Sequence, residues 1–290
     1  MPPDVMINIA TLVPTRACAL RLGEKGQTLL RAAAQQGEPS LALEMIRLGA
    51  CIDYPDTELT TPLVLGLTHL VVLTAVAAEC PAQLSRSEDY HRSKRRVIRI
   101  AWVCKLIIEQ HADVNKTDGD YAPLDLACKV EHWNLITLLL EHGANPERRG
   151  PDGLQAVNRL TATGSKTRFL GLVRKNSNPV RPAKPCPCWS GKLLDECHAL
   201  GPKPYPSVFL CRSVSGKLHG NCRLQRNVSF QEVWYKPKQA LVTTQRSYGD
   251  PRELCPQMSQ WDFSGSTSAF DIWRSYTVVL DLARHEVWLR

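Results

Sequence analysis

A pattern that returns along the first half of the chain most limits what this sequence can fold into. One apolar stretch with helical spacing ends at Leu48-Gly49-Ala50, and similar stretches end at Ala112 and Ala144, which lie 32 residues apart. Upstream of these stretches, Thr28 precedes Thr61 by 33 residues. A period in this range predicts stacked structural repeats, each burying its apolar face against its neighbours.

Each repeat has the same anatomy. In the third, Gly119 to Ala127 predicts a turn and a short helix, and Leu138 to Asn145 predicts the end of a second helix. Glycine before the terminal Ala ends that helix by adopting a left-handed backbone without strain. A degenerate fourth unit begins at Asp152. These segments, over residues 24–165, resemble ankyrin repeats. The resemblance implies a helical solenoid whose exposed face binds protein partners.

The chain departs from the ankyrin pattern in three places. Leu29 stands where the family has Pro in the first repeat, and Asp125 replaces the usual His in the third. The second repeat contains an insertion of about 28 residues, at about 65–103. We expect it to form two lengthened helices joined by an exposed loop. Its basic run from His91 to Arg96 favours a solvated helix face, with nucleic-acid binding or targeting as the alternative.

Composition and the N-terminal segment limit the compartment. With 290 residues, 43% of them hydrophobic, the chain has material for about two globular domains. An Asp precedes any Lys or Arg, and Pro14 interrupts the first apolar stretch, so no secretory signal is predicted. The uncharged run from Thr60 to Ala78 approaches the length of a membrane helix, but its Pro and Gly favour a core helix. We expect a cytoplasmic or nuclear protein, not secreted and without a membrane span, whose cysteines are reduced or metal-bound.

The densest chemical motif in the chain is Cys186-x-Cys188 followed by Cys197-His198. Two cysteines two residues apart can bind one ion from a single tight turn, and Ser190-Gly191 lets the chain fold back. Zinc takes four such ligands in a tetrahedron, and three thiolates with one imidazole leave no open position. The sequence therefore predicts one structural Zn2+ site held by Cys186, Cys188, Cys197 and His198. The alternative is a set of incidental buried cysteines.

The same segment, Cys-Pro-Cys-x-Ser-Gly-Lys and then Cys-His, resembles the SEC-C motif, a zinc module found at the C-terminal tail of the bacterial preprotein translocase motor. Trp189 stands where that family usually has a small residue, often Gly. A similar pattern recurs 25 residues further along the chain, where Cys211 and Cys222 flank another Ser-Gly-Lys. This stretch resembles a degenerate second copy of the motif. His219 and Cys255 could complete a second metal site there, or the copy could be metal-free. The resemblance implies a docking role for the module.

The positive charge is concentrated in one segment. From Arg174 to Lys238 the chain has twelve Lys or Arg and three acidic residues, a net +9, whereas the whole chain carries +8. Such a segment attracts acidic partners, including nucleic acid. Aromatic side chains interleave with it: Trp189, Tyr205, Phe209, Phe230, Trp234 and Tyr235. They could stack on unpaired bases or form the small core of a zinc module.

These features give a mainly α protein with five segments. They are an N-terminal extension (1–23), the ankyrin repeats (24–165), a linker (166–185), the zinc module with its degenerate copy (186–238) and a partly helical tail (239–290). We found no catalytic signature, since neither Ser-Gly-Lys has the earlier Gly or the following Ser/Thr of a phosphate-binding loop. The sequence thus predicts a non-enzymatic scaffold or adaptor. The alternatives are a protein that binds acidic partners or nucleic acid through its basic segment, and an enzyme with a hidden site.

Overall fold

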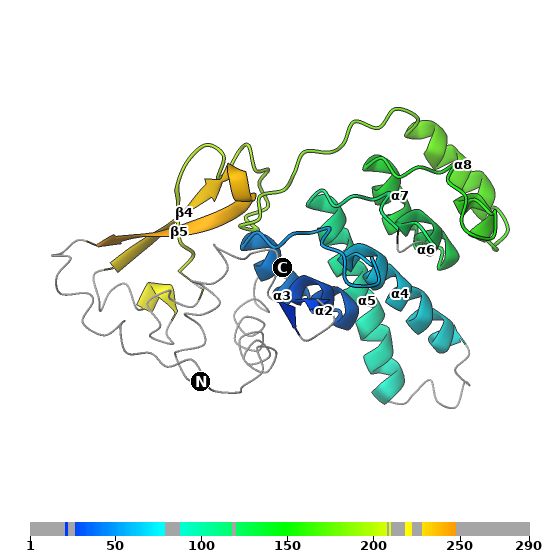
Figure 1. Ribbon diagram of the computed structural model, residues 1–290, viewed down its shortest axis with the longest axis horizontal. Helices are drawn as coiled ribbons and strands as arrows, with labels where there is room; N and C mark the ends of the chain where they lie inside the picture. Colours follow the sequence, from blue (N-terminus) through cyan, green and yellow to red (C-terminus); the bar gives the residue numbers. More distant parts are fainter. Residues whose placement is uncertain are drawn as a thin grey trace. The chain divides into compact units, whose positions relative to one another are not determined.

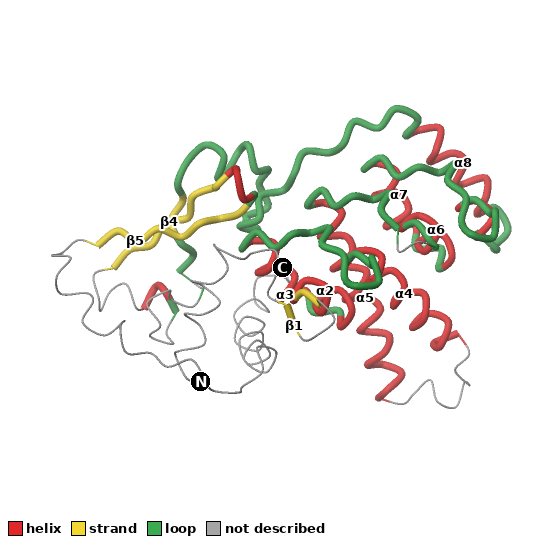
Figure 2. Tube along the Cα trace, viewed as in Figure 1, coloured by secondary structure: helices red, strands yellow, loops and turns green. Residues whose placement is uncertain are grey.

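The structure is a computed structural model, and it describes residues 21–22, 27–78, 88–117, 120–207, 209, 218–221 and 228–247. Helices dominate its N-terminal part, and a small antiparallel sheet follows (Figure 1; Figure 2). The prediction of a mainly α protein is confirmed. The described residues fall into two compact units, one made of 21–46 and 50–193 and the other of 47–49 and 194–247.

The described chain begins with two short strands and a series of helices. The strands β1 (Arg21–Leu22) and β2 (Gln27–Thr28) precede the helices α2 (Leu29–Gln36), α3 (Pro39–Arg47), α4 (Pro62–Ala78), α5 (Glu88–Glu109), α6 (Pro123–Lys129), α7 (Trp133–Glu141), η2 (Ala156–Arg159) and α8 (Ser165–Lys175). The remaining elements are β3 (Lys203–Pro204), β4 (Val228–Tyr235), η3 (Lys236–Lys238) and β5 (Ala240–Ser247).

The helices of the first unit form a row of successive pairs (Figure 1). The first helices of the pairs are in contact, α2 with α4 and α4 with α6, and the second helices α5 and α7 also pack together. Leu67 and Leu70 of α4 and Ile107 of α5 are fully buried in this row. A Cβ atom on Gly66 would lie only 2.8 Å from the Sγ atom of Cys104, so glycine at this position allows α4 and α5 to approach closely.

Side-chain caps begin the first helix of each pair. The Thr28 hydroxyl accepts a hydrogen bond from the N–H of Arg31, and the Thr61 hydroxyl accepts one from the N–H of Val64. The third repeat has no Thr at this point. Its Asp125 carboxylate instead accepts the backbone N–H of Ala122 at 3.0 Å. The Asp that replaces the family's His therefore still satisfies a backbone donor at the helix start.

The second helix of each pair ends in the same way in three repeats. Gly49, His111 and Gly143 all have a left-handed backbone, with φ of 81°, 71° and 88°. In each case the N–H of the following Ala donates to the carbonyl five residues earlier. Such a bond satisfies a carbonyl that the helix end leaves without a partner. His111 adopts this conformation although it is not glycine.

The loops after these helix ends repeat a hydrogen bond from one repeat to the next. The N–H of Asp113 donates to the carboxylate of Asp53, at 3.0 and 3.1 Å. One repeat later, the N–H of Asn145 donates to the Oδ1 atom of Asn115, at 2.8 Å. Asp53 and Asn115 each follow the terminal Ala by three residues, and Asp113 and Asn145 each follow it by one. The same bond thus joins equivalent positions across two successive interfaces.

The second repeat has longer helices than its neighbours. α4 and α5 contain 17 and 22 residues, whereas α2 and α3 contain 8 and 9. Residues 79–87, between α4 and α5, lie outside the described part. In the described residues, no helix combines the length and the apolar character that crossing a membrane requires.

Part of the stretch that the sequence predicts as a linker is helical. Residues 166–175 belong to α8, which buries Phe169 and packs against α7 and η2. The chain that follows is hydrogen-bonded to the end of α5. The Gln110 side chain donates to the carbonyl of Pro185, and the ring N–H of His111 donates to the carbonyl of Pro182, both at 2.9 Å. These bonds hold the chain just before the cysteine motif.

The second unit contains a three-stranded antiparallel sheet in the order β3-β4-β5. The register of β4 and β5 runs from Val228 opposite Ser247 to Tyr235 opposite Ala240. Residues 240–247, where the sequence predicts the start of a partly helical tail, are therefore a strand. The β-branched residues of β5 are stabilised by pairing with β4. The local sequence pattern does not reveal that pairing partner, so it did not predict a strand. The rest of that tail, for which the sequence predicts partial helix, lies outside the described residues.

Candidate metal centre

A tight turn carries the first two cysteines. Pro185 and Leu193 form an antiparallel bridge, and within it the N–H of Cys186 donates to the carbonyl of Lys192 at 2.9 Å. The N–H of Trp189 donates to the carbonyl of Cys186, which closes the turn. Trp189 and Gly191 have positive φ angles of 59° and 78°. Such a left-handed backbone favours a small residue at position 189.

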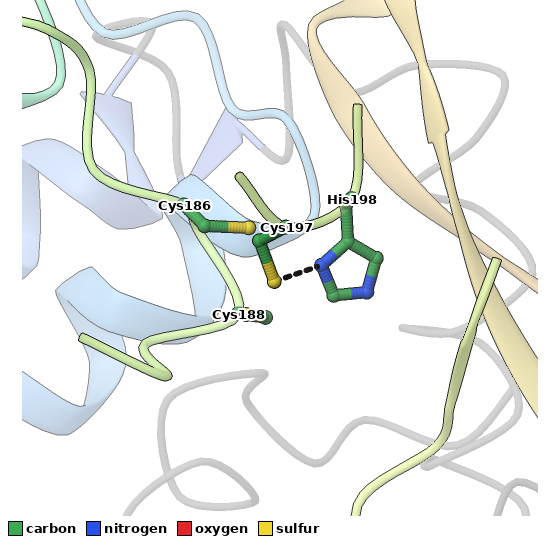
Figure 3. A group of neighbouring side chains, drawn as sticks. All are labelled: Cys186, Cys188, Cys197 and His198. Carbon is green, nitrogen blue, oxygen red and sulfur yellow. Dashed lines mark hydrogen bonds between the residues drawn. The ribbon is translucent and has the colours of Figure 1, made fainter. Parts of the chain in front are cut away.

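A second turn delivers the other two candidate ligands. The N–H groups of Cys197 and Ala199 both donate to the carbonyl of Leu194, at 3.1 and 3.0 Å. These bonds turn the chain sharply, so that Cys197 and His198 face the Cys186–Cys188 turn (Figure 3). The local bonds of residues 185–201 therefore assemble the motif from a short stretch of chain.

The four candidate ligands lie together as the sequence predicts. The sulfur atoms of Cys186, Cys188 and Cys197 and a ring nitrogen of His198 all lie within 4.8 Å of one another. Cys186, Cys197 and His198 are buried, and Cys188 is half-buried. The Sγ atom of Cys197 lies 3.4 Å from Nδ1 of His198, and the Cys188 thiol donates to the Ser190 hydroxyl at 3.2 Å. This group is close enough to bind a metal ion.

The donor set and its spread fit a tetrahedral metal. Thiolate ligands about 2.3 Å from one zinc ion lie about 3.8 Å from each other, so small side-chain movements within the 4.8 Å group bring four donors onto one ion. Three sulfurs and one imidazole are the kind of set that soft or borderline metals prefer over oxygen-binding ones. A complete set of four donors leaves no position for a substrate or a water nucleophile.

Two other cysteines differ from those of the cluster. Burial raises the pKa of Cys104 to about 12, and burial also raises the pKa of Cys128. Both are core residues of the repeat helices, on α5 and α6. Their thiols stay protonated at neutral pH, so they are packing groups rather than metal ligands or nucleophiles.

Trp189 attaches the cysteine turn to the repeats. Its indole N–H donates to the carbonyl of Leu43, in α3, at 3.1 Å. The partner lies 146 residues earlier in the chain. The residue that departs from the SEC-C pattern thus makes a contact that glycine could not make.

Two residues that lie outside the cysteine motif adjoin the cluster, and the sequence did not predict them. The Nε2 atom of His198 lies 3.9 Å from the Glu232 carboxylate, and Arg47 forms an ion pair with that same carboxylate. One signal was available in the sequence. In β4 the alternation places Glu232 in phase with Phe230, on the buried side of the strand. For Arg47, no local pattern pointed to this part of the chain.

The structure tests only part of the degenerate second motif. Cys211, Cys222 and Cys255 lie outside the described residues. His219 is described and buried, and its ring packs edge-on against Tyr205, with ring centres 5.3 Å apart.

The structure shows whether several aromatic side chains of the basic segment are buried or exposed. Three of them, Tyr205, Phe209 and Phe230, are buried next to one another. They therefore form a core and do not offer their faces to bases. Tyr235, by contrast, is exposed.

Comparison with known proteins gives one family match. The family model of the ankyrin repeat matches residues 120–151, which include α6, α7 and the loop that carries Asn145. No curated protein matches the chain. Ankyrin repeats generally mediate protein–protein interactions, so the match indicates an interaction role for this part of the chain.

Proposed function

We propose that this protein is a non-enzymatic adaptor, whose residues 24–165 form an ankyrin solenoid that binds a protein partner. The observation that carries the proposal is the recurring loop bond, Asp53 to Asp113 and Asn115 to Asn145, around the matched unit. A bond that recurs at equivalent positions supports one continuous stack of repeats. Such a stack presents a row of loop tips to a partner.

Two of the loops that precede helices, which we call tips, expose apolar side chains. Leu59 and Leu154 are 67% and 42% exposed. Leu59 lies three residues before Pro62, the first residue of α4, and Leu154 lies two residues before Ala156, the first residue of η2. Exposed leucines in the loops that precede two helices are suited to contact with an apolar patch of a partner protein.

We propose that the Cys/His cluster holds one structural Zn2+ ion. The ligands would be Cys186, Cys188, Cys197 and His198, and the ion would supply a fixed crosslink between the two turns. Because the donor set is complete, the site supports folding rather than catalysis. Reducing compartments keep cysteines available as thiolate ligands, and we propose a cytoplasmic or nuclear location on this ground.

Substitution of the exposed leucines tests the adaptor role. The Leu59→Asn/Leu154→Asn variant removes both apolar tips, and Asn tolerates the left-handed backbone at position 59, where φ is 62°. We expect proteins captured from lysate by the full-length chain to fall by about 5- to 30-fold, the effect of losing an interface hot spot. Leu200→Asn is the matched control, because Leu200 is 74% exposed outside the repeats. Quantitative mass spectrometry of the captured material gives the ratios.

The salt dependence of the same capture separates the two candidate modes of binding. An apolar contact through the repeat tips should persist from low to moderate salt. Binding of nucleic acid through residues 174–238 should instead weaken steeply as salt rises. Capture that is lost with salt and unchanged in the tip variant would refute the adaptor proposal.

A further inference from the structure

A buried ion pair lies next to the metal ligand His198. Arg47 and Glu232 are paired through their side chains, and each side chain is only 1% exposed. Both belong to the same compact unit, because residues 47–49 join the unit that holds the sheet. The Arg47 guanidinium also lies over the rings of Tyr205 and Phe209, 5.3 and 4.8 Å from the ring centres.

The two nitrogens of the His198 ring face different groups. Nδ1 lies 3.4 Å from the sulfur of Cys197, on the side of the candidate ligands (Figure 3). Nε2 lies 3.9 Å from Oε2 of Glu232. A histidine that binds a metal through one nitrogen usually donates the N–H of the other to a carboxylate, carbonyl or water, and this partner fixes the tautomer.

Burying Glu232 and Arg47 is costly, so the pair calls for an explanation. Two charges removed from water regain the lost solvation only with good geometry, and apolar replacements often stabilise a protein as well or better. Packing alone therefore explains the pair poorly. A carboxylate needed as an acceptor beside His198 explains it, since Arg47 pairs with Oε1 of Glu232 and leaves Oε2 directed at His198.

We propose that Glu232 is a positioning residue of the metal site: when the ligands close on the metal, its carboxylate moves from 3.9 Å to hydrogen-bond distance and accepts the Nε2–H of His198, so that Nδ1 is the nitrogen offered to the metal. Arg47 holds Glu232 in place through the other carboxylate oxygen. This inference rests on the proposed zinc site and adds to it two residues outside the cysteine motif.

The test measures zinc affinity by competition with a chromophoric chelator. Arg47→Met/Glu232→Leu removes both charges and the acceptor oxygens at once, so no single buried charge remains. We expect the full-length double variant to bind zinc about 10- to 100-fold more weakly than the wild type, as is typical when a partner of a metal-binding histidine is lost. The matched control is Arg99→Met/Glu38→Leu, which removes an ion pair of 2.6 Å between α5 and the loop that joins α2 to α3 and should leave zinc affinity unchanged.

A second measurement needs no variant. Long-range 1H–15N spectra of the zinc-loaded wild type report which nitrogen of His198 carries the proton. We expect the proton on Nε2 and zinc on Nδ1. The opposite tautomer, or equal zinc affinity in wild type and double variant, overturns the role of Glu232 while leaving the zinc site intact. A wild type that binds no zinc overturns the site itself, so the two failures are distinguishable.

Discussion

At the scale of single residues, Trp189 has an unfavourable backbone conformation and a favourable side-chain hydrogen bond. Its backbone is left-handed, a conformation that disfavours side chains larger than glycine. Its indole N–H reaches the carbonyl of Leu43. The contact explains how a bulky residue can occupy a position at which the SEC-C pattern favours a small one.

Trp189→Gly should therefore separate zinc binding from attachment of the turn. Glycine relieves the backbone, so we expect zinc content to stay at the wild-type level. Loss of the indole bond, worth about 1 kcal/mol, should make amide exchange in residues 182–193 roughly fivefold faster. Hydrogen exchange with mass spectrometry measures this. Trp189→Phe, which loses the N–H but keeps a ring, is the companion variant, and unchanged exchange in both would contradict the anchoring role.

The clustering of the four candidate ligands could be predicted from the sequence, but the residues around them could not. Cys186, Cys188, Cys197 and His198 lie within one short stretch, so local turns suffice to gather them. Glu232 and Arg47 reach His198 only through tertiary packing. A lone buried Glu in an alternating strand is a usable signal, but it does not say which group the carboxylate faces.

At the scale of elements, the loop after α6 is tied to the start of α8 through one side chain. The Glu131 carboxylate accepts hydrogen bonds from the N–H groups of Thr161 and Ala162 and from the Ser165 hydroxyl, at 2.8, 2.9 and 2.7 Å. These bonds, led by the one from Ala162, lower the pKa of Glu131 to about 2. A single carboxylate thus joins the matched ankyrin repeat to the segment that follows it.

Glu131→Gln should weaken this join in a pH-dependent way. Because the pKa is lower in the folded chain than its ordinary value of 4.5, the ionised group stabilises the fold above pH 4.5. This contribution is lost as pH falls from 4.5 towards 2. We expect the variant to have a Tm about 2–4 °C lower than the wild type at pH 7, and the difference to disappear near pH 2. Thermal melts across this range, with the exposed Glu88→Gln as control, provide the measurement; a constant difference would contradict the assignment.

Helices were more predictable than strands for a physical reason. Repeat periodicity and Gly-Ala ends mark helices such as α3 and α7 locally. His111 shows the limit, because it takes the left-handed position without being glycine. For β4 and β5, stability comes from pairing across the sheet, which a local pattern does not reveal.

At the scale of the whole molecule, the two units are stabilised in different ways. The unit of residues 21–46 and 50–193, called the repeat unit below, buries many Leu, Ile and Val side chains. Its successive loops are joined by hydrogen bonds. In the described part of the other unit, the core is small and centres on Tyr205, Phe209 and Phe230. A unit with so little apolar material often depends on a metal or another crosslink for its stability.

Zinc removal should therefore unfold one unit and leave the other. We expect the purified chain to contain about one zinc per chain by elemental analysis, and Cys197→Ser to lose it, since a structural site needs its full ligand set. Cys51→Ser, which removes a cysteine outside the cluster, should keep the metal. After chelation, helical circular dichroism should change little, because the helices lie mainly in the repeat unit. Protease cleavage and amide exchange should increase selectively in residues 194–247. A chain without metal, a Cys197→Ser variant that retains zinc, or equal unfolding of both units would contradict a zinc-dependent second unit.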